Sequence, residues 1–293
     1  MAKILFTGSR GYLGARFLSR HQDEHTIMGI HRHNVNILDK ASLELCFRDF
    51  RPDYVIHGAA ITSTAFAEAN PELTRQVNVE GAVNVAEECA RYGAKMMFLS
   101  TEQVFNGNVE GGPFSEEDIP QPNTVYGATK LRAEEKLRKI LDELWILRFT
   151  WLFDLPEAGH PVNPNIVWNA FRLAMENEPR VIPMYDFRGH TYGREVVEKL
   201  PLFFHLPYGV YHVGSHNNLG CYELTCKILQ EMGLESRIGE LIIPDKKKFK
   251  KRSRDIRLNC GKASEMGIGF PKTRDSVMTC LKDFGLARAF STE

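Results

Sequence analysis

The most constraining feature of this sequence is the segment "FTGSRGYLG" at residues 6–14, which places glycines at positions 8, 11 and 14. A short apolar run leads into it, and a segment with helical spacing follows. A strand that ends in such a loop and enters a helix is typical of a dinucleotide-binding βαβ unit. Gly8 would allow the tight turn, Gly11 would let the backbone approach a pyrophosphate, and Gly14 would let helix and strand pack closely.

The first half of the chain continues this alternation of strand and helix. Apolar runs at 25–31, 53–60, 94–100 and 144–149 predict strands. Helical patterns lie between them, over 39–50, 72–92 and from Tyr126 onward, and Asp39 is a plausible N-cap. Such alternation implies right-handed crossovers and a parallel sheet covered on both faces. We therefore predict an α/β protein with a Rossmann-like, doubly wound parallel sheet.

The pattern changes after about Trp151. A proline-rich loop (155–165) and a helical segment (166–177) come next, and then a helix and a strand over 193–214 that return to the sheet. We predict that residues 1–153 and about 185–214 form the NADP-binding Rossmann-like domain. Residues from about 154 to 184 and 215–293 would form a smaller, mainly helical, C-terminal substrate-binding domain.

Composition narrows the functional classes. The 37 basic and 37 acidic side chains cancel, so no global charge favours binding to nucleic acid or to an anionic membrane. No apolar stretch is long enough for a signal peptide or a membrane span, and the six cysteines have no zinc-site spacing. His57, His190 and His212 are interpreted as core or loop histidines rather than metal ligands. We expect a cytoplasmic protein without a metal, a nucleic-acid partner or a membrane partner.

The end of the second predicted strand bears on the choice of cofactor. NAD sites usually carry a carboxylate there, whereas this chain reads "GIHRHN", with His31 and Arg32. A guanidinium suits a ribose phosphate, and Arg10 in the glycine loop could reach the same group. The sequence therefore favours NADP(H) over NAD; the alternative is that Arg32 is a solvated surface residue. The candidate cofactor loop comprises Gly8, Ser9, Arg10, Gly11, Tyr12, Leu13 and Gly14.

A possible catalytic pair lies in "YGATK", where Tyr126 and Lys130 are one helical turn apart. The spacing is common by chance, and a buried ring beside a solvated amine is the alternative. The pair gains weight from Thr101 in "FLSTEQVFNG", because ligands bind beyond the carboxyl ends of parallel strands. Thr101 could equally cap the turn that follows it. A nearby ammonium is expected to lower the pKa of Tyr126 from about 10 toward neutrality.

Several ordered motifs now point to one family. "STEQVFNG" stands where its members read STDYVFDG, and "YGATKLRAE" where they read YGKTKLxGE; "FTWLF" and "GVYH" match a TSW-type segment and GxYH. Over nearly the whole chain, the sequence resembles the extended short-chain dehydrogenase/reductase superfamily, and within it the dTDP-4-dehydrorhamnose reductase group.

The resemblance implies roles for individual residues. Tyr126 would be the general acid, Lys130 its partner, and Thr101 a hydrogen-bond donor to the substrate oxygen. The reaction would transfer a hydride from NADPH to a keto group of a nucleotide-linked sugar. Further cofactor contacts carried over by position are Asn36, Ile37, Ala59, Ala60, Thr62 and Asn78, besides Tyr126 and Lys130. Candidate substrate contacts are Thr101, Glu102, Gln103, Trp151 and Arg252. Singly, each could instead be a packing or capping residue.

Departures from the family pattern leave alternatives open. Glu102 and Gln103 replace the usual Asp-Tyr, and because an amide does not titrate, Gln103 argues against a dehydratase. A sugar-nucleotide epimerase remains possible. So does a non-catalytic NADP-binding regulatory subunit, since the β-subunit of methionine adenosyltransferase resembles the same group. The segment "DKKKFKKRSRDIRLN" keeps little of the group's RPxxSxLD motif and reads as a diphosphate-binding cluster or a solvated loop. The helical stretches at 72–92 and 126–142 are candidates for a homodimer interface.

Overall fold

A computed structural model describes residues 1–176 and 178–290 of the chain. Its centre is a six-stranded sheet with all strands parallel, in the order β10-β5-β4-β3-β1-β2. The doubly wound α/β prediction is confirmed. The strands of this sheet are β1 (Lys3–Thr7), β2 (Thr26–Ile30), β3 (Tyr54–His57), β4 (Lys95–Thr101), β5 (Leu144–Phe149) and β10 (Gly209–Val213).

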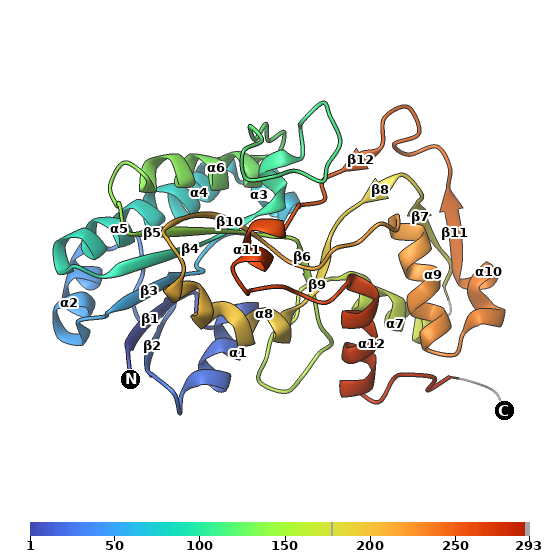
Figure 1. Cartoon of the computed structure of the whole chain (residues 1–293), viewed down its shortest axis with the longest axis horizontal. Helices are drawn as coiled ribbons and strands as arrows, with labels where there is room; N and C mark the ends of the chain where they lie inside the picture. Colours follow the sequence, from blue (N-terminus) through green and yellow to red (C-terminus); the bar gives the residue numbers. More distant parts are fainter. Residues whose placement is uncertain (177, 291–293) are drawn as a thin grey trace.

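Helices cover both faces of the sheet (Figure 1). One face packs in a core that includes Phe47, Val85 and Leu137, and the other packs around Phe17, Val197 and Phe203. The helices on or beside the first face are α2 (Lys40–Phe50), α3 (Thr64–Ala69), α4 (Pro71–Arg75), the π-helical turn η1 (Gln76–Glu80), α5 (Gly81–Tyr92) and α6 (Val125–Leu137). Those on the second face are α1 (Tyr12–His21), α8 (Gly193–Lys199), the 3₁₀ helix η3 (Leu200–His205) and α11 (Gly261–Glu265).

Local sequence signals account for several boundaries. The Asp39 side chain accepts a hydrogen bond from Ser42 N (3.3 Å) and caps α2, as predicted. Thr124 caps α6 by accepting from Gly127 N (3.1 Å). The helix predicted over 72–92 is present as one continuous helical run, formed by α4, η1 and α5, in which the π-helical turn η1 inserts a residue.

A second group of elements lies at the right of Figure 1 and has its own core, which includes Phe153, Leu173 and Ile228. Its helices are α7 (Ile166–Glu176), α9 (Cys221–Glu231), η4 (Glu235–Arg237), α10 (Ile238–Leu241) and α12 (Thr273–Asp283). Three two-stranded parallel ladders accompany them: β6 (Trp151–Phe153) with β9 (His190–Tyr192), β7 (Arg180–Pro183) with β11 (Ile242–Asp245), and β8 (Asp186–Phe187) with β12 (Arg254–Asp255). None of these six short strands was predicted from the sequence.

Two parts of the sequence predictions lie outside the described residues: Asn177, at the end of the helix predicted over 166–177, and residues 291–293 of the predicted second domain. Within the described chain, no helix is both long and apolar enough to span a bilayer.

Candidate active site

The glycine loop has the geometry that its spacing predicts. Gly8 has a φ of +74°, and a Cβ there would lie 2.8 Å from Ala59 N. A Cβ on Gly14 would lie 2.6 Å from Gly8 O, so only glycine lets α1 pack this closely on the loop. At Gly11, the first residue before α1, a Cβ would meet only Gly8 O within 4 Å. The backbone there is open to a ligand at the positive end of the helix.

Cationic side chains gather where β2 ends. Ser9 N donates to Ile30 O (3.0 Å), which holds the glycine loop against the end of β2. The pKa of His31 is lowered by partial desolvation and by the nearby charges of Arg10 and His33. Arg10 and Arg32 are exposed. This arrangement fits an anionic ribose phosphate better than the diol of NAD.

Some predicted cofactor residues use their side chains elsewhere. The Tyr12 hydroxyl donates to Phe153 O (2.9 Å), Leu13 packs in the core on the sheet face, and Ile37 is buried against Gly81. Only their backbone groups or edges are left for a ligand. Asn36 is exposed and its amide oxygen accepts from Leu38 N (3.1 Å).

The loop after β3 carries Ala59, Ala60 and Thr62 along the carboxyl edge of the sheet. Asn78, in the π-helical turn η1, fixes this loop. Its amide oxygen accepts from Ile61 N (2.7 Å), and its nitrogen donates to Ile61 O (3.0 Å) and to Thr129 Oγ1 (3.1 Å). Asn78 therefore ties the loop to α6, which carries Tyr126.

Two of the three predicted catalytic residues, Thr101 and Tyr126, lie together at the carboxyl end of β4. Thr101 is the last residue of β4, Tyr126 lies in the first turn of α6, and Lys130 follows one turn later. The Thr101 hydroxyl is close enough to the Tyr126 phenol to lower the pKa of that phenol. Tyr126 is 9% exposed and Lys130 2%. A phenol and a hydroxyl thus lie together at this edge of the sheet, and the buried Lys130 amine, on the same helix as the phenol, lies 3.8 Å from the centre of the Phe98 ring.

Burial sets the ionisation of this group. It raises the pKa of Tyr126 to about 12; the charge of Glu102 adds to the rise, and the bond to Thr101 opposes it. Burial lowers the pKa of Lys130 to about 7, against the opposing effect of Glu134. The pKa of Tyr126 is thus raised, whereas the sequence predicted that Lys130 would lower it, because desolvation dominates. The Lys130 amine itself lies 3.8 Å from the centre of the Phe98 ring.

A buried ion pair that the sequence analysis missed supports α6. Arg148 on β5 donates to Glu134 on α6 through Nη2–Oε2 (2.7 Å), and Ser100 Oγ donates to Glu134 Oε1 (2.5 Å). Both charged groups are at most 3% exposed. The pair fixes α6 to β4 and β5, and so fixes the height of Lys130 four residues earlier. The sequence feature that could have indicated this ion pair is Arg148, a charged residue within the otherwise apolar segment "LWILRF".

A second cluster lies next to Thr101, on the side of β8 and β9. Glu102 is 2% exposed; its Oε1 is 3.4 Å from Arg188 Nη1, and its Oε2 has no partner in the described chain. The Arg188 guanidinium lies 4.9 Å from the centre of the Trp151 ring, and the centre of the His190 ring lies 5.5 Å from the centre of the same Trp151 ring. Both His190 nitrogens are buried without partners. Arg188 and His190 were not predicted as substrate residues, because only the fold brings them to Trp151.

The acidity of Glu102 leads to a prediction about stability. Burial raises its pKa from 4.5 to about 8, so the folded chain holds this proton through neutral pH. A carboxyl with a raised folded-state pKa stabilises the fold most below pH 4.5, and this stability is lost as pH rises through 8. Glu102→Gln removes that titration. In thermal melts, the melting temperature of the variant relative to wild type should therefore be higher at pH 8.5 than at pH 5; a difference that does not change with pH would contradict the assignment.

The other two predicted substrate residues have different surroundings. Gln103 follows Glu102 in the 3₁₀ turn η2 (Glu102–Phe105), and its backbone N donates to Thr101 Oγ1 (3.2 Å). Its carbonyl lies against α6, where a Cβ on Gly127 would be 2.4 Å away. Arg252 is exposed and donates to Asn108 O. Its recorded bond is to this loop, not to Thr101, Tyr126 or Lys130.

The histidines singled out by sequence are buried and neutral. His57 Nδ1 pairs with Thr7 Oγ1 (2.9 Å), and His212 Nδ1 with Phe114 O (3.0 Å). Burial lowers the pKa of His57, His190 and His212 to about 3. The described residues contain no group of three or more His, Cys, Asp or Glu placed to hold a metal ion.

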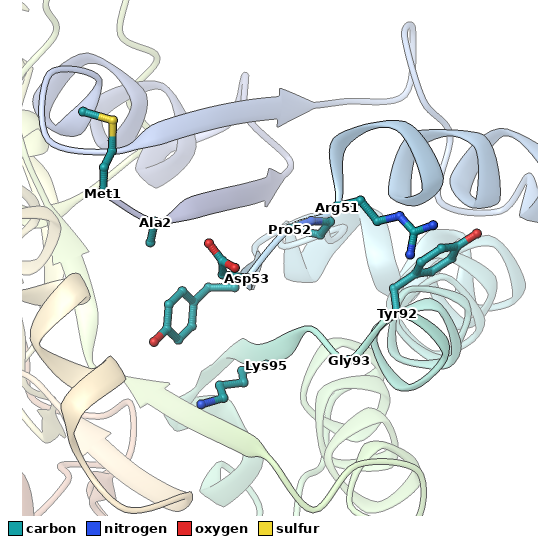
Figure 2. A pocket seen from close by; sticks show the side chains of 9 residues that line it. Met1, Ala2, Arg51, Pro52, Asp53, Tyr92, Gly93 and Lys95 are labelled. Atoms are coloured by element: carbon teal, nitrogen blue, oxygen red, sulfur yellow. The ribbon is translucent and has the colours of Figure 1, made fainter.

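A hollow of about 580 Å³ lies at the opposite edge of the sheet, where the strands begin. Figure 2 shows its lining, with Arg51 beside the Tyr92 ring and Lys95 on a separate strand. Asp53 also lines it and accepts from Lys3 N (2.7 Å). It shares no residue with the group around Tyr126, so it does not belong to the candidate active site.

Comparison with known proteins identifies the family. A family model described as the RmlD substrate binding domain matches residues 2–286. The spore coat polysaccharide biosynthesis protein SpsK of Bacillus subtilis is 30% identical over 239 residues, 81% of this chain and 82% of its own length. Methionine adenosyltransferase 2 subunit beta of Bos taurus is 27% identical over 280 residues, 91% of this chain and 83% of its own length.

Among solved structures, dTDP-4-dehydrorhamnose reductase of Bacillus anthracis, in complex with NADP, has a TM-score of 0.84 at 23% identity. The match covers 97% of this chain and 99% of that one. It shows the same fold from end to end. With a family model that matches almost the entire chain, these comparisons show that the protein belongs to the RmlD substrate-binding domain family of the extended short-chain dehydrogenase/reductase superfamily.

Proposed function

We propose that this protein is an NADP(H)-dependent reductase that transfers a hydride to a keto group of a nucleotide-linked sugar. The observation that carries the proposal is the buried group at the end of β4, where Tyr126 lies beside Thr101 and Lys130 follows one helical turn later. The reductase among the structural relatives supports the same reading.

In this proposal each residue has a defined task. The Tyr126 phenol holds a proton at every physiological pH, and it donates this proton to the substrate oxygen as negative charge develops there. The Thr101 hydroxyl hydrogen-bonds the same oxygen. Bound NADPH supplies the hydride. Lys130, in its charged form, stabilises the phenolate that remains, and its pKa of about 7 makes this assistance dependent on pH.

The choice of NADPH rests on the cationic group at the end of β2. Removing one guanidinium that binds a phosphate costs about 1.5–3 kcal/mol, or roughly 10- to 150-fold in affinity. We expect Arg32→Ala to raise the Kd for NADPH by about tenfold or more and to leave the Kd for NADH nearly unchanged. Isothermal titration with both cofactors measures this. Equal losses for NADPH and NADH would contradict a 2′-phosphate contact.

A second candidate function is a non-catalytic regulatory subunit that binds NADP. It is favoured by the relative from Bos taurus, which is itself a subunit of an adenosyltransferase and aligns with 91% of this chain. The two candidates differ in turnover. The test is NADPH oxidation by the wild-type protein across a panel of nucleotide-linked 4-keto sugars, with cofactor binding measured in parallel. Oxidation with any sugar supports the reductase; binding without oxidation supports the regulatory subunit.

A further inference from the structure

A run of exposed cations connects β11 to β12. We call residues 246–252 the basic loop; Figure 1 shows it in orange at the upper edge of the second group of elements. Its exposed cations are Lys246, Lys247, Lys248, Lys250, Lys251 and Arg252. Across residues 1–176 and 178–290, none of these six is recorded in an ion pair. The chain as a whole is neutral, so this concentration of unpaired charge is local.

The basic loop is anchored at both ends. Asp245 accepts hydrogen bonds from Lys247 N and Lys248 N (both 2.9 Å). At the far end, the Arg254 guanidinium lies 4.6 Å from the half-buried Phe249 ring and is itself bonded to Asp186 (Nε–Oδ1, 2.8 Å). Because the backbone is held in this way, the lysines are presented together on one protruding segment.

Exposed apolar side chains lie beside the basic loop. Val181 on β7 and Ile243 on β11 are register partners in their ladder, and they are 62% and 47% exposed. Ile243 precedes the first lysine of the loop by three residues. A two-stranded ladder with a directly paired Val and Ile facing solvent is costly unless something covers it.

The number of positive charges on the basic loop and the exposed Val181–Ile243 pair together indicate which kind of partner binds this surface. A nucleotide diphosphate carries about two negative charges at its bridge, far fewer than six cations need, and nucleic acid would leave Val181 and Ile243 unused. A bilayer surface with anionic headgroups uses both features, since clusters of about four to eight Lys and Arg bind such surfaces and apolar side chains enter the boundary below the headgroups. Zero net charge does not oppose this, because screening limits the field to about 8–10 Å.

We propose that the basic loop and the Val181–Ile243 pair form a peripheral docking surface for a bilayer that contains anionic phospholipids. The expectation of no membrane partner rested on the net charge of the whole chain, which does not reveal this local surface. The proposal is independent of the reductase function, because it concerns where the protein is held and not what it turns over.

The test is co-sedimentation of the full chain with vesicles of phosphatidylcholine alone and of phosphatidylcholine mixed with phosphatidylglycerol. The loop variant changes Lys246, Lys247, Lys250 and Lys251 to Gln, and it keeps Phe249, Arg252 and Arg254 so that the loop conformation is preserved. The matched control changes four exposed lysines elsewhere: Lys139, Lys227, Lys272 and Lys282 to Gln. A third variant, Val181→Thr with Ile243→Thr, tests the apolar pair while keeping β-branched side chains on the strands.

Wild type should bind the mixed vesicles, bind phosphatidylcholine at least about tenfold more weakly, and lose affinity as salt is added. The loop variant should bind the mixed vesicles at least about tenfold more weakly than wild type, and the control variant like wild type. The threonine variant should also bind more weakly than wild type. Three results would each overturn the proposal: no binding to the mixed vesicles at low salt, equal loss in loop and control variants, or tighter binding to a DNA or RNA oligonucleotide than to the vesicles at the same salt. So would a loop variant that keeps vesicle binding but needs at least tenfold more sugar nucleotide, since the loop would then be a substrate clamp.

Discussion

Replacing Tyr126 with Phe is expected to lower kcat/KM for the keto-sugar substrate by about 10²- to 10⁴-fold, the usual contribution of a positioned general acid. Phenylalanine keeps the ring, which is 9% exposed, and removes only the hydroxyl beside Thr101. Folding and NADPH affinity should therefore change little. Stopped-flow NADPH oxidation, with cofactor binding measured by titration, checks both parts.

The matched control for this experiment is Tyr208→Phe. Tyr208 is 39% exposed, and its hydroxyl donates to Glu143 Oε1 (2.7 Å), near the amino ends of the strands and away from Thr101. It should keep wild-type turnover. If Tyr126→Phe also retained most of the wild-type turnover, Tyr126 could not be the proton donor.

Arg148→Ala is expected to lower the free energy of unfolding by about 3–5 kcal/mol, because it leaves the Glu134 carboxylate buried without its counter-charge. Arg148 contacts Glu134 at 2.7 Å, stacks over the Phe105 ring (5.3 Å), and lies 3.5 Å from His212 Nε2. Denaturant unfolding monitored by circular dichroism measures the loss. Released from Arg148, Glu134 should also raise the pKa of Lys130, which shifts the pH profile of turnover upward in pH.

The control for the ion pair is Arg48→Ala, a variant that removes an arginine from an exposed pair. Arg48 is 55% exposed and pairs with the exposed Asp49 (2.8 Å), so its removal should cost about 0–1 kcal/mol. A second variant combines Arg148→Met with Glu134→Gln, which removes both charges and should recover part of the stability lost in Arg148→Ala. If Arg148→Ala cost no more than Arg48→Ala, the pair would not hold α6 in place.

The parts of the fold that the sequence predicted are those specified locally. The glycine spacing predicted the turn because each glycine answers a steric demand within a few residues, at Gly8 and Gly14 most directly. Asp39 predicted the start of α2 for the same reason. Five of the six parallel strands were predictable as mostly buried apolar runs, whereas β2, at the edge of the sheet, buries only Ile30 and was predictable from its apolar residues alone. Thr101 and Tyr126 followed from their positions at strand and helix ends.

What the sequence did not predict depends on contacts distant along the chain. Glu134 and Arg148 find each other only once α6 lies on β5, and Glu102 meets Arg188 across 86 residues. The β8 and β12 strands have two residues each, too few for any periodicity. The shifted pKa of Lys130 could not be predicted from the sequence either, because the burial that lowers it to about 7 is a property of the whole fold.

The most direct test of the central claim is transfer of deuterium from NADPH labelled at the nicotinamide C4 position to a nucleotide-linked 4-keto sugar, followed by mass spectrometry of the sugar. The account predicts a reduced sugar that carries the label with wild type, and a rate at least about 100-fold lower with Tyr126→Phe. Tight NADPH binding with every sugar in the panel recovered unlabelled and unreduced would contradict catalysis, and would favour the regulatory subunit.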